Sequence, residues 1–345
     1  MASKANARII LRRRPDGLPS ADDFALEQAP VPVPRDGEVL VRTLLVSIDP
    51  AMRHWVTGGA NYVEPVALGS TMRSFGVGEV VKSRIPGYIP GDIVVGMTGW
   101  QEWATLSAAE VHGSVDPKLA PLSTSLGVLG VNGMTAYVGM LDIGRPKAGE
   151  TVLVSIAAGS VGSAAGQLAA LSGARVVGLA GSAEKSRLCV EEFGFDACID
   201  YKSVADLGAA LDEHCSDGID VFFDSVGGQT LDAVLERINI GARIAICGTI
   251  SLPAGEVAHG PRIERTLLVK RALMQGFLLT DHLDYRTMMI NELATYVRDG
   301  KLRYREDVAH TLTDAPKALE RLLAGKNTGK SIVRVGELPE EVSAP

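Results

Sequence analysis

A glycine-containing turn between two apolar runs is the first place where residue types and spacing indicate chemistry. Residues 151–156 are apolar and rich in Val, which is typical of a buried parallel strand. Residues 157–162 have the pattern A-x-G-x-x-G, and small and apolar residues at helical spacing follow. In such a unit the glycines let the backbone approach a pyrophosphate, whose charge lies against the helix N-terminus. A tight turn without a ligand is the alternative, but a second apolar run at 175–180 completes a βαβ unit and favours a dinucleotide.

The end of that second run bears on which dinucleotide is bound. An NAD site normally carries Asp or Glu there, about 20 residues beyond the glycines, to bind the ribose hydroxyls. This chain has Ala180, Gly181 and Ser182, so no carboxylate would repel a 2′-phosphate. Lys185 and Tyr201 follow, and a cation and a phenol are suitable donors to a phosphate monoester. We therefore predict NADP(H) rather than NAD(H); a solvated lysine and a strand-end tyrosine without a ligand are the alternative.

The composition is that of an ordinary mildly acidic globular protein. The chain has 345 residues, a net charge of −7 and 46% hydrophobic residues, enough for two domains with separate cores. Nucleic acid is not expected as a partner, because phosphate-backbone binding needs a basic surface. The sequence contains no run of 18 apolar residues, so we expect no membrane-spanning helix. The four cysteines show no metal-ligand spacing, which favours free thiols in a reducing, cytoplasmic compartment.

The texture of the chain changes twice and predicts an α/β fold in two domains. Residues 1–123 contain short Val and Ile runs separated by Pro and Gly, as in a small β-barrel. A helix is expected over 123–141, and residues 124–307 then alternate strands and helices, which predicts a parallel sheet covered on both faces. The tail, 308–345, has mixed texture and contains a strand at 331–335 without a helix partner. We expect this tail to return to the first domain.

Strings along nearly the whole chain resemble the medium-chain dehydrogenase/reductase superfamily, in its zinc-independent branch of leukotriene B4 dehydrogenases, prostaglandin reductases and curcumin or alkenal double-bond reductases. The resemblance depends on their joint order and spacing. The strings are S-I-D-P-A-M-R (47–53), G-V-G (76–78), G-D-I-V (91–94), G-W-Q-E (99–102), G-V-L-G (127–130), T-A-Y (135–137), F-D-S-V-G-G (223–228), R-I-A-I-C-G (243–248) and N-T-G-K (327–330).

This resemblance implies a GroES-like β-barrel catalytic domain beside a Rossmann NADP-binding domain, and NADPH-dependent reduction of the C=C bond of α,β-unsaturated ketones or aldehydes. It also implies a homodimer through the edge strand near 273–279. The residues that we expect to bind the cofactor are Asn132, Thr135, Ala158, Gly159, Ser160, Val161, Gly162, Gly181, Ser182, Lys185, Tyr201, Ser225, Val226, Cys247, Gly248, Thr249, Ile250, Phe277, Leu278 and Asn327. The resemblance itself matches Thr135, Gly159, Gly162, Lys185, Tyr201, Cys247, Gly248 and Asn327, whereas Asn132 stands where relatives commonly have proline. Those expected in the substrate pocket are Asp49, Met52, Arg53, Trp55 and Tyr62.

Zinc-dependent members of the superfamily need a Cys and a His in the barrel domain. No cysteine precedes Cys189 here, and His54 and His112 are the only histidines in the barrel half. A set of three ligands is not available there, so the sequence excludes zinc-assisted alcohol oxidation as the mechanism.

Without a metal, hydride transfer needs an acceptor that is already electrophilic, such as a conjugated carbonyl compound. Hydride adds at the β carbon and negative charge moves to the carbonyl oxygen; a donor must stabilise this enolate oxygen before the α carbon takes a proton. Tyr62 is our candidate for this donor, against the alternative of a loop tyrosine that packs on the surface. Many relatives carry a Tyr-Asn pair after the strand that ends at Gly248; this chain has Leu252-Pro253 in that segment.

Three alternatives to an enone reductase stay open from the sequence. A zinc-independent quinone reductase would share the fold, the cofactor and the conjugated acceptor. An NADP-dependent alcohol dehydrogenase would run in the oxidative direction. A non-catalytic nucleotide-binding scaffold or sensor would explain the missing Tyr-Asn pair.

Overall fold

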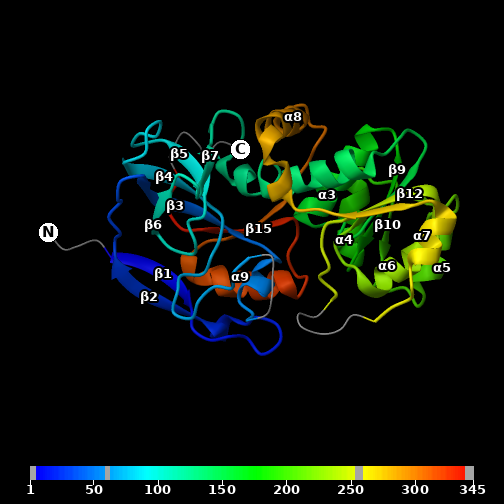
Figure 1. The fold of residues 1–345 in the computed structure, drawn as a ribbon, viewed down its shortest axis with the longest axis horizontal. Coiled ribbons are helices and arrows are strands. Elements are labelled where there is room, and N and C mark those ends of the chain that lie inside the picture. The colour runs from blue at the N-terminus through cyan, green and yellow to red at the C-terminus, as the bar shows by residue number, and fades with distance from the viewer. Residues whose placement is uncertain (1–4, 59–62, 253–258, 339–345) are drawn as a thin grey trace. The chain divides into compact units, whose positions relative to one another are not determined.

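The computed structural model describes residues 5–58, 63–252 and 259–338 (Figure 1). The chain forms two compact units. Unit 1 comprises Met1–Leu126 and Glu306–Pro345, and unit 2 comprises Gly127–Arg305. Each unit has its own sheets and its own core, and candidate site residues lie at strand ends and turns within each unit.

Unit 2 is built on a parallel sheet of six described strands, in the order β10-β9-β8-β11-β12-β13. These strands are short and largely apolar, as expected where helices cover both faces of a sheet. The order places β8 between β9 and β11, so the carboxyl ends of β8, β9 and β11 lie at one edge of the sheet. The strands are β8 (Thr151–Val154), β9 (Arg175–Ala180), β10 (Ala197–Asp200), β11 (Ile219–Asp224), β12 (Ile238–Ile246) and β13 (Leu273–Gly276).

Helices lie on both faces of this sheet, because alternate strand residues point in opposite directions. Val177 and Ile199 share a core with Leu211 of α5 and Val234 of α6. Gly178, which points to the other face, lies close to Cys198 and Phe195, and the Phe195 ring contacts Gly166 of α3. The helices of unit 2 are α2 (Val131–Tyr137), η3 (Val138–Gly144), α3 (Ser160–Leu171), α4 (Ala183–Glu191), α5 (Leu207–His214), α6 (Gly228–Leu235), α7 (Glu264–Lys270), η4 (Leu279–Tyr285) and α8 (Arg286–Arg298).

Unit 1 is mainly antiparallel. A seven-stranded sheet follows the path β14-β15-β3-β4-β5-β7, with β6 also paired to β3, and β1 and β2 form a separate hairpin. Its strands are β1 (Ala5–Leu11), β2 (Phe24–Pro30), β3 (Glu38–Ile48), β4 (Gly76–Ser83), β5 (Ile93–Gly96), β6 (Trp103–Ser107), β7 (Val111–Ser114), β14 (Glu306–Ala309) and β15 (Lys330–Arg334). Its short helices are η1 (Ala21–Asp23), α1 (Met52–Trp55), η2 (Leu122–Leu126), η5 (Leu312–Asp314) and α9 (Ala315–Leu323).

The C-terminal tail returns to the first sheet, as expected. Strand β15 pairs antiparallel with β3, with Ile332 opposite Ser47 and Val333 opposite Val46. Val333 is fully buried in the unit 1 core together with Trp55 and Leu319, a residue of α9. The last strand of the chain is therefore a central strand of the N-terminal sheet.

One sequence-based expectation about helices is wrong. The expected continuous helix over 123–141 is broken, because residues 127–130 turn between η2 and α2. This turn passes so close to Gly133 that a Cβ there would lie 1.8 Å from Val128 O. Helix α9 lies in the tail, where the sequence analysis described only mixed texture.

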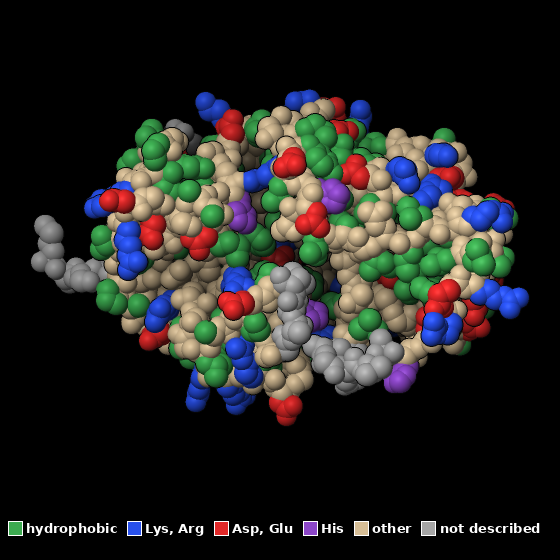
Figure 2. Space-filling model, viewed as in Figure 1, with side chains coloured by type: hydrophobic (Ala, Val, Ile, Leu, Met, Phe, Trp, Pro, Cys, Tyr) green, Lys and Arg blue, Asp and Glu red, His purple; other side chains and the backbone are tan. Residues whose placement is uncertain are grey.

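The surface is mixed in charge on the face that Figure 2 shows, where basic and acidic side chains are interspersed over both units. Among the described residues, no helix is long and apolar enough to span a bilayer.

Candidate functional site

The glycine turn after β8 forms a helix N-terminus suited to an anion. Gly159 is the N-cap of α3, and the first intrahelical bond runs from Ser163 N–H to Gly159 O at 2.9 Å. The amide groups of residues 160–162 precede that bond and are available to a ligand. A Cβ on Gly162 would lie 2.3 Å from Ile156 O, and Ile156 itself has a φ of +50°. Only glycine at 162 allows this turn, and the turn fits a pyrophosphate.

The predicted residues of this turn are therefore together. Ala158 is buried beneath it, and Gly159, Ser160 and Val161 are partly accessible. The turn is held against the neighbouring strand, because Ala157 N–H donates to Leu179 O at 3.0 Å.

The residues predicted to recognise a 2′-phosphate also meet, at the ends of β9 and β10. Ser182 is the N-cap of α4, and its hydroxyl accepts a hydrogen bond from Lys185 N–H at 3.2 Å. Tyr201 N–H donates to Ala180 O at 3.1 Å, which brings the two strand ends together. A Cβ on Gly181 would lie 3.4 Å from the Tyr201 hydroxyl oxygen. No carboxylate stands at positions 180–182, as the sequence already indicated, so the donor set fits a phosphate monoester.

A third group of predicted residues forms a pair of turns after β11 and β12. The Asp224 carboxylate is fully buried and accepts hydrogen bonds from Val226 N–H at 2.8 Å and Gly227 N–H at 3.0 Å. Ser225 N–H donates to the Ser155 hydroxyl at 2.7 Å. Burial raises the pKa of Asp224, and these hydrogen bonds oppose that shift. Asp224 therefore acts as a structural anchor that links this turn to β8.

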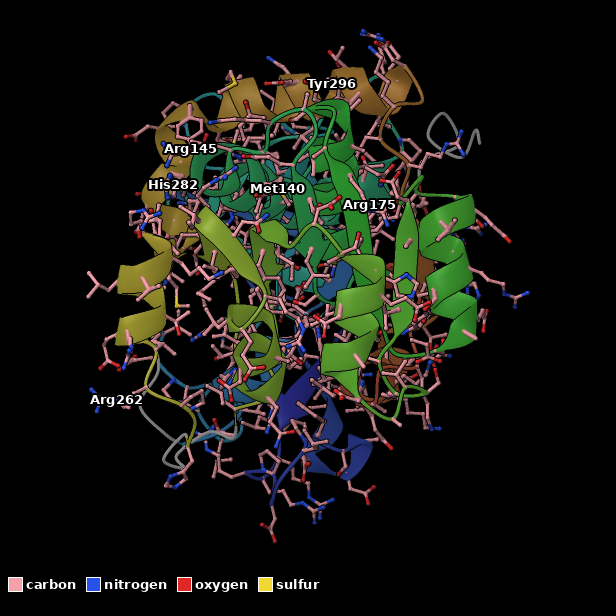
Figure 3. All side chains as sticks on the ribbon, turned by 90° about the vertical axis from the view of Figure 1, so that its right-hand side faces the viewer. Met140, Arg145, Arg175, Arg262, His282 and Tyr296 are labelled. Atoms are coloured by element: carbon pink, nitrogen blue, oxygen red, sulfur yellow. The ribbon has the colours of Figure 1, made fainter. Side chains whose placement is uncertain are left out.

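The turn after β12 is hydrogen-bonded to the turn after β11. Cys247 N–H donates to Asp224 O at 2.7 Å, and Ile250 N–H donates to Ser225 O at 3.3 Å. The predicted residues Ser225, Val226, Cys247, Gly248, Thr249 and Ile250 thus lie together at the carboxyl edge of the sheet. Burial raises the pKa of the Cys247 thiol to about 12, so this cysteine is neutral at physiological pH. Figure 3 labels Arg175, the first residue of β9, which marks the opposite, amino edge of the sheet. It also labels Arg262, which follows β12 in the chain.

Other predicted cofactor residues lie on α2 and after β13. The Thr135 hydroxyl donates to Val131 O at 2.7 Å, which leaves its oxygen as an acceptor. Asn132, on the same helix, is partly buried. A Cβ on Gly139 would lie 2.7 Å from Phe277 Cζ, so the Phe277 ring packs against η3, whereas Leu278 is 44% exposed.

In unit 1, the returning tail and the segment after β3 are joined by a buried ion pair. Lys330 Nζ donates to Ile48 O at 2.8 Å and lies 2.9 Å from Asp49 Oδ1. The Ser47 hydroxyl also donates to the Asp49 carboxylate. Asn327 is buried, and its side-chain amide donates to Gly329 O at 2.9 Å. The sequence analysis named Asp49 and Asn327 but did not identify Lys330 as the residue that holds Asp49.

The expected pocket residues of α1 differ in exposure. Met52 is fully buried and Trp55 is 6% exposed, and both belong to the unit 1 core, whereas Arg53 is partly exposed. The Arg73 guanidinium lies 5.8 Å from the centre of the Trp55 ring. Among the described residues, the Trp55 indole N–H has no hydrogen-bond partner. Tyr62, the expected donor to the enolate oxygen, lies outside the described residues, so its role stays a prediction.

Within the described part of the chain, no group of three or more His, Cys, Asp or Glu side chains is placed to hold a metal ion.

Comparisons with known proteins agree with this arrangement. Residues 7–113 match a family described as the N-terminal domain of oxidoreductase, and residues 160–295 match one described as zinc-binding dehydrogenase. The NADPH-dependent curcumin reductase of Escherichia coli (strain K12) is 41% identical, with 96% of this chain and 97% of that protein covered. The NADP(+)-dependent 2-alkenal reductase of Nicotiana tabacum is 40% identical, with 96% and 98% covered.

A solved structure extends the comparison to the fold. The crystal structure of CurA from Vibrio vulnificus in complex with NADPH superposes with a TM-score of 0.90 at 39% identity, covering 96% of this chain and 100% of that one. This confirms the expected fold class, a Rossmann-like parallel-sheet unit with a separate, mainly antiparallel unit. The chain therefore belongs to the medium-chain dehydrogenase/reductase superfamily, in the zinc-independent branch that contains the curcumin, alkenal and prostaglandin reductases.

Proposed function

We propose that this protein is an NADP-dependent oxidoreductase that uses NADPH to reduce the C=C bond of α,β-unsaturated ketones or aldehydes. The observation that supports the proposal lies in unit 2, where the N-terminus of α3 and the space beside Gly181 and Tyr201 are separate features that would suit a pyrophosphate and a 2′-phosphate. The E. coli curcumin reductase and the tobacco 2-alkenal reductase, both similar to this chain over nearly their whole length, support the substrate class.

The residues of the chain have distinct tasks in this proposal. Bound NADPH supplies the hydride, and a conjugated carbonyl compound is electrophilic enough to accept it without a metal. The residue 160–162 amides bind the pyrophosphate, and Lys185 and Tyr201 bind the 2′-phosphate. Thr135 offers an acceptor oxygen near the nicotinamide, and Asn327 contributes from the tail. Tyr62 is our proposed donor to the enolate oxygen; its hydroxyl would stabilise the charge that develops there.

An acceptor panel tests this function. Purified protein is mixed with NADPH, and separately with NADH, and the loss of reduced-nicotinamide absorbance is followed with conjugated ketones, conjugated aldehydes, quinones and saturated ketones. We expect the conjugated ketones and aldehydes to be consumed, with NADPH preferred, and the saturated carbon–carbon product to be found by mass spectrometry.

The same panel separates the alternatives. Faster turnover of quinones than of enones would identify a quinone reductase, and oxidation of alcohols with NADP⁺ would identify an alcohol dehydrogenase. Tight NADPH binding without consumption of any acceptor would contradict the enzyme and indicate a nucleotide-binding scaffold.

We also propose that the protein is a cytoplasmic homodimer that pairs through β13. This strand is the edge of the unit 2 sheet, and Leu273 is 41% exposed on it. Leu268 and Val269 of α7, which precedes β13 in the chain, are 77% and 57% exposed, so exposed apolar side chains accompany a strand that has one free edge. Light scattering should give a dimer mass that falls to the monomer mass in Leu273→Lys. Cell fractionation tests the compartment.

A further inference from the structure

The space beside Gly181 is bounded by a residue that the sequence analysis did not name. Strands β9 and β10 end together, with Ala180 opposite Asp200, so the residues that follow each strand are neighbours. A Cβ on Gly181 would lie 3.3 Å from Lys202 Cε and 3.4 Å from the Tyr201 hydroxyl oxygen. The lysine stem and the phenol therefore converge on the same glycine, which provides a small space at the end of β9.

The backbone of Lys202 is held in place by the turn that follows β10. Lys202 N–H donates to the Asp200 carboxylate at 3.2 Å, and Ser203 N–H donates to Asp200 O at 3.0 Å. The ammonium lies one bond beyond Cε, at an exposed position, and no carboxylate of the described residues lies within ion-pair distance of it. The acidic residues nearest to Lys202 in sequence are Asp200 and Asp206. Lys202 is thus a cation whose stem lies beside Gly181 and that has no ion-pair partner in the described part of the chain.

We propose that Lys202 is a specificity-determining residue that binds the 2′-phosphate monoester of the cofactor together with Lys185 and Tyr201. Because residue 181 has no side chain, Lys202 and Tyr201 can both reach the 2′-phosphate in this space. This inference depends on the proposed function, because it concerns discrimination between NADPH and NADH. A compact ammonium adds charge to the site without a fixed hydrogen-bond geometry, which suits a phosphate at the end of an exposed turn.

The test measures binding and does not need turnover. Isothermal titration is carried out with adenosine 2′,5′-bisphosphate and adenosine 5′-monophosphate, and with NADPH and NADH, on the wild type, Lys202→Gln and Lys147→Gln. Lys147 is a matched control, because it is an exposed lysine of unit 2 that precedes β8, at the opposite edge of the sheet. Since a hydrogen bond to a charged group contributes about 1.5–3 kcal/mol, we expect Lys202→Gln to weaken the bisphosphate and NADPH by about 10- to 100-fold. Binding of the 5′-monophosphate and NADH should be unchanged, and Lys147→Gln should change none of the four.

Gly181→Ala provides a second variant that keeps every charge. Its added Cβ would press on Lys202 and Tyr201, so the same two ligands should bind more weakly, and the other two should not. Unchanged bisphosphate affinity in Lys202→Gln, or an equal loss for both nucleotides, would overturn the role of Lys202. A wild type that does not prefer the bisphosphate would instead overturn the NADPH assignment, and the inference with it.

Discussion

The Lys330 ammonium lies 2.9 Å from Asp49 Oδ1 and joins residues 281 positions apart in the chain. The pair is nearly enclosed, with side-chain exposures of 4% for Lys330 and 16% for Asp49. It connects two parts of the candidate site in unit 1, because Lys330 closes the N-T-G-K string that contains Asn327, and Asp49 precedes the α1 residues. The tail strand is therefore held both by its sheet hydrogen bonds and by this ion pair.

Breaking the Lys330–Asp49 pair from one side should destabilise the protein strongly. Lys330→Met leaves the Asp49 carboxylate buried without its counter-charge, and such changes cost about 3–5 kcal/mol. The free energy of unfolding from urea denaturation, followed by a unit 1 tryptophan signal, measures this loss. The double variant Asp49→Asn/Lys330→Met should recover part of it, because it removes both charges. If the loss of unfolding free energy in the double variant equalled the sum of the losses in Lys330→Met and Asp49→Asn, the two charges would not be coupled.

Much of the fold could be predicted from local patterns, because a buried strand needs an apolar run and little else. The limits 175–180 of the second strand of the βαβ unit agree with β9 as found. The broken helix at 123–141 could not be predicted in this way, since apolar periodicity is the same on either side of a turn that is set by the contact between Gly133 and Val128.

The candidate site shows the same limit. Lys185 and Tyr201 are found by their distance from the glycine turn, which a βαβ unit fixes in sequence. The placement of Tyr201 and Lys202 beside Gly181, and of Lys330 beside Asp49, depends on strand register, because these residues meet only after β10 aligns with β9 or β15 aligns with β3. Residue spacing in one chain does not contain that register.

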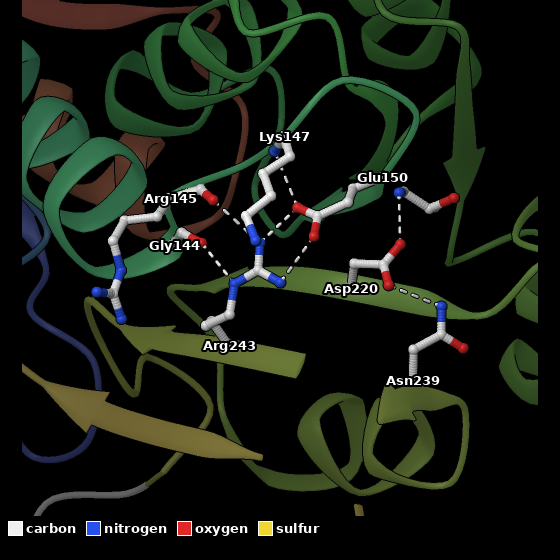
Figure 4. Close-up of polar contacts among 8 residues, drawn as sticks. Gly144, Arg145, Lys147, Glu150, Asp220, Asn239 and Arg243 are labelled. Atoms are coloured by element: carbon white, nitrogen blue, oxygen red, sulfur yellow. Dashed lines mark hydrogen bonds and ion pairs between the residues drawn. The ribbon is translucent and has the colours of Figure 1, made fainter. Parts of the chain in front are cut away.

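The Arg243–Glu150 pair should make stability depend on pH. Arg243 donates to Gly144 O at 2.8 Å, to Arg145 O at 3.0 Å and to Glu150 Oε1 at 3.0 Å (Figure 4). Burial alone would raise the pKa of Glu150, but its bonds to Arg243 and Lys147 N–H outweigh this and lower it below its usual 4.5. Because the pKa of Glu150 is lower in the folded protein than in the unfolded chain, ionised Glu150 stabilises the fold at pH values above its unfolded pKa. This contribution is lost as the pH falls through its folded pKa.

We therefore expect Glu150→Gln to cost about 1.5–3 kcal/mol in the free energy of unfolding at neutral pH, and progressively less below pH 4.5. Urea denaturation over this pH range measures the difference. Asp36→Asn is a suitable control, because the Arg84–Asp36 pair is exposed, at 44% and 95%, and should contribute under about 1 kcal/mol. A constant difference between Glu150→Gln and the wild type at all pH values would contradict the linkage.

Glu292 should control stability at alkaline pH, because two phenols donate to it. Tyr137 Oη lies 2.8 Å and Tyr296 Oη 2.6 Å from its carboxylate, which links α2 to α8; Figure 3 labels Tyr296 on α8. The bond to Glu292, with burial, raises the pKa of Tyr296 to about 12, and burial together with Glu292 raises the pKa of Tyr137. Because the pKa values of both tyrosines are higher in the folded protein, their protonated forms stabilise the fold at pH values below the unfolded pKa of about 10. This contribution is lost as the pH rises through their folded pKa values.

Phenolate absorbance during alkaline titration tests this cluster. Tyr296→Phe should remove one late-titrating phenol, and Glu292→Gln should move both phenols toward about pH 10. Unfolding of the wild type should become easier above about pH 10, and Glu292→Gln should reduce that dependence. Titration curves that are identical in the wild type and in Glu292→Gln would show that the carboxylate does not perturb the phenols.

Substitutions in the glycine turn should separate nucleotide binding from folding. A Cβ on Gly162 would lie 2.3 Å from Ile156 O, a backbone atom, so Gly162→Ala must move the turn itself. For Gly159 the nearest atoms are Ile156 Cγ2 at 2.9 Å and Ile156 O at 3.1 Å, so Gly159→Ala crowds the turn less and should have a smaller effect. If Gly162→Ala removes one amide bond to a charged pyrophosphate, worth about 1.5–3 kcal/mol, NADPH affinity should fall by about 10-fold or more.

Gly166→Ala is the control for this series, since it lies in the same helix but beyond the turn. Its Cβ would lie 2.0 Å from the Phe195 ring, so the helix would be overpacked. We expect Gly166→Ala to lose about 1–3 kcal/mol in the free energy of unfolding and to melt at a lower temperature. NADPH affinity of the folded Gly166→Ala protein should stay near the wild-type value, because residues 160–162 keep their place. Titration with NADPH and thermal unfolding of the three variants measure the two effects separately. If affinity fell in proportion to stability in all three, the turn would not be the pyrophosphate site, and the glycines would serve only the packing of α3.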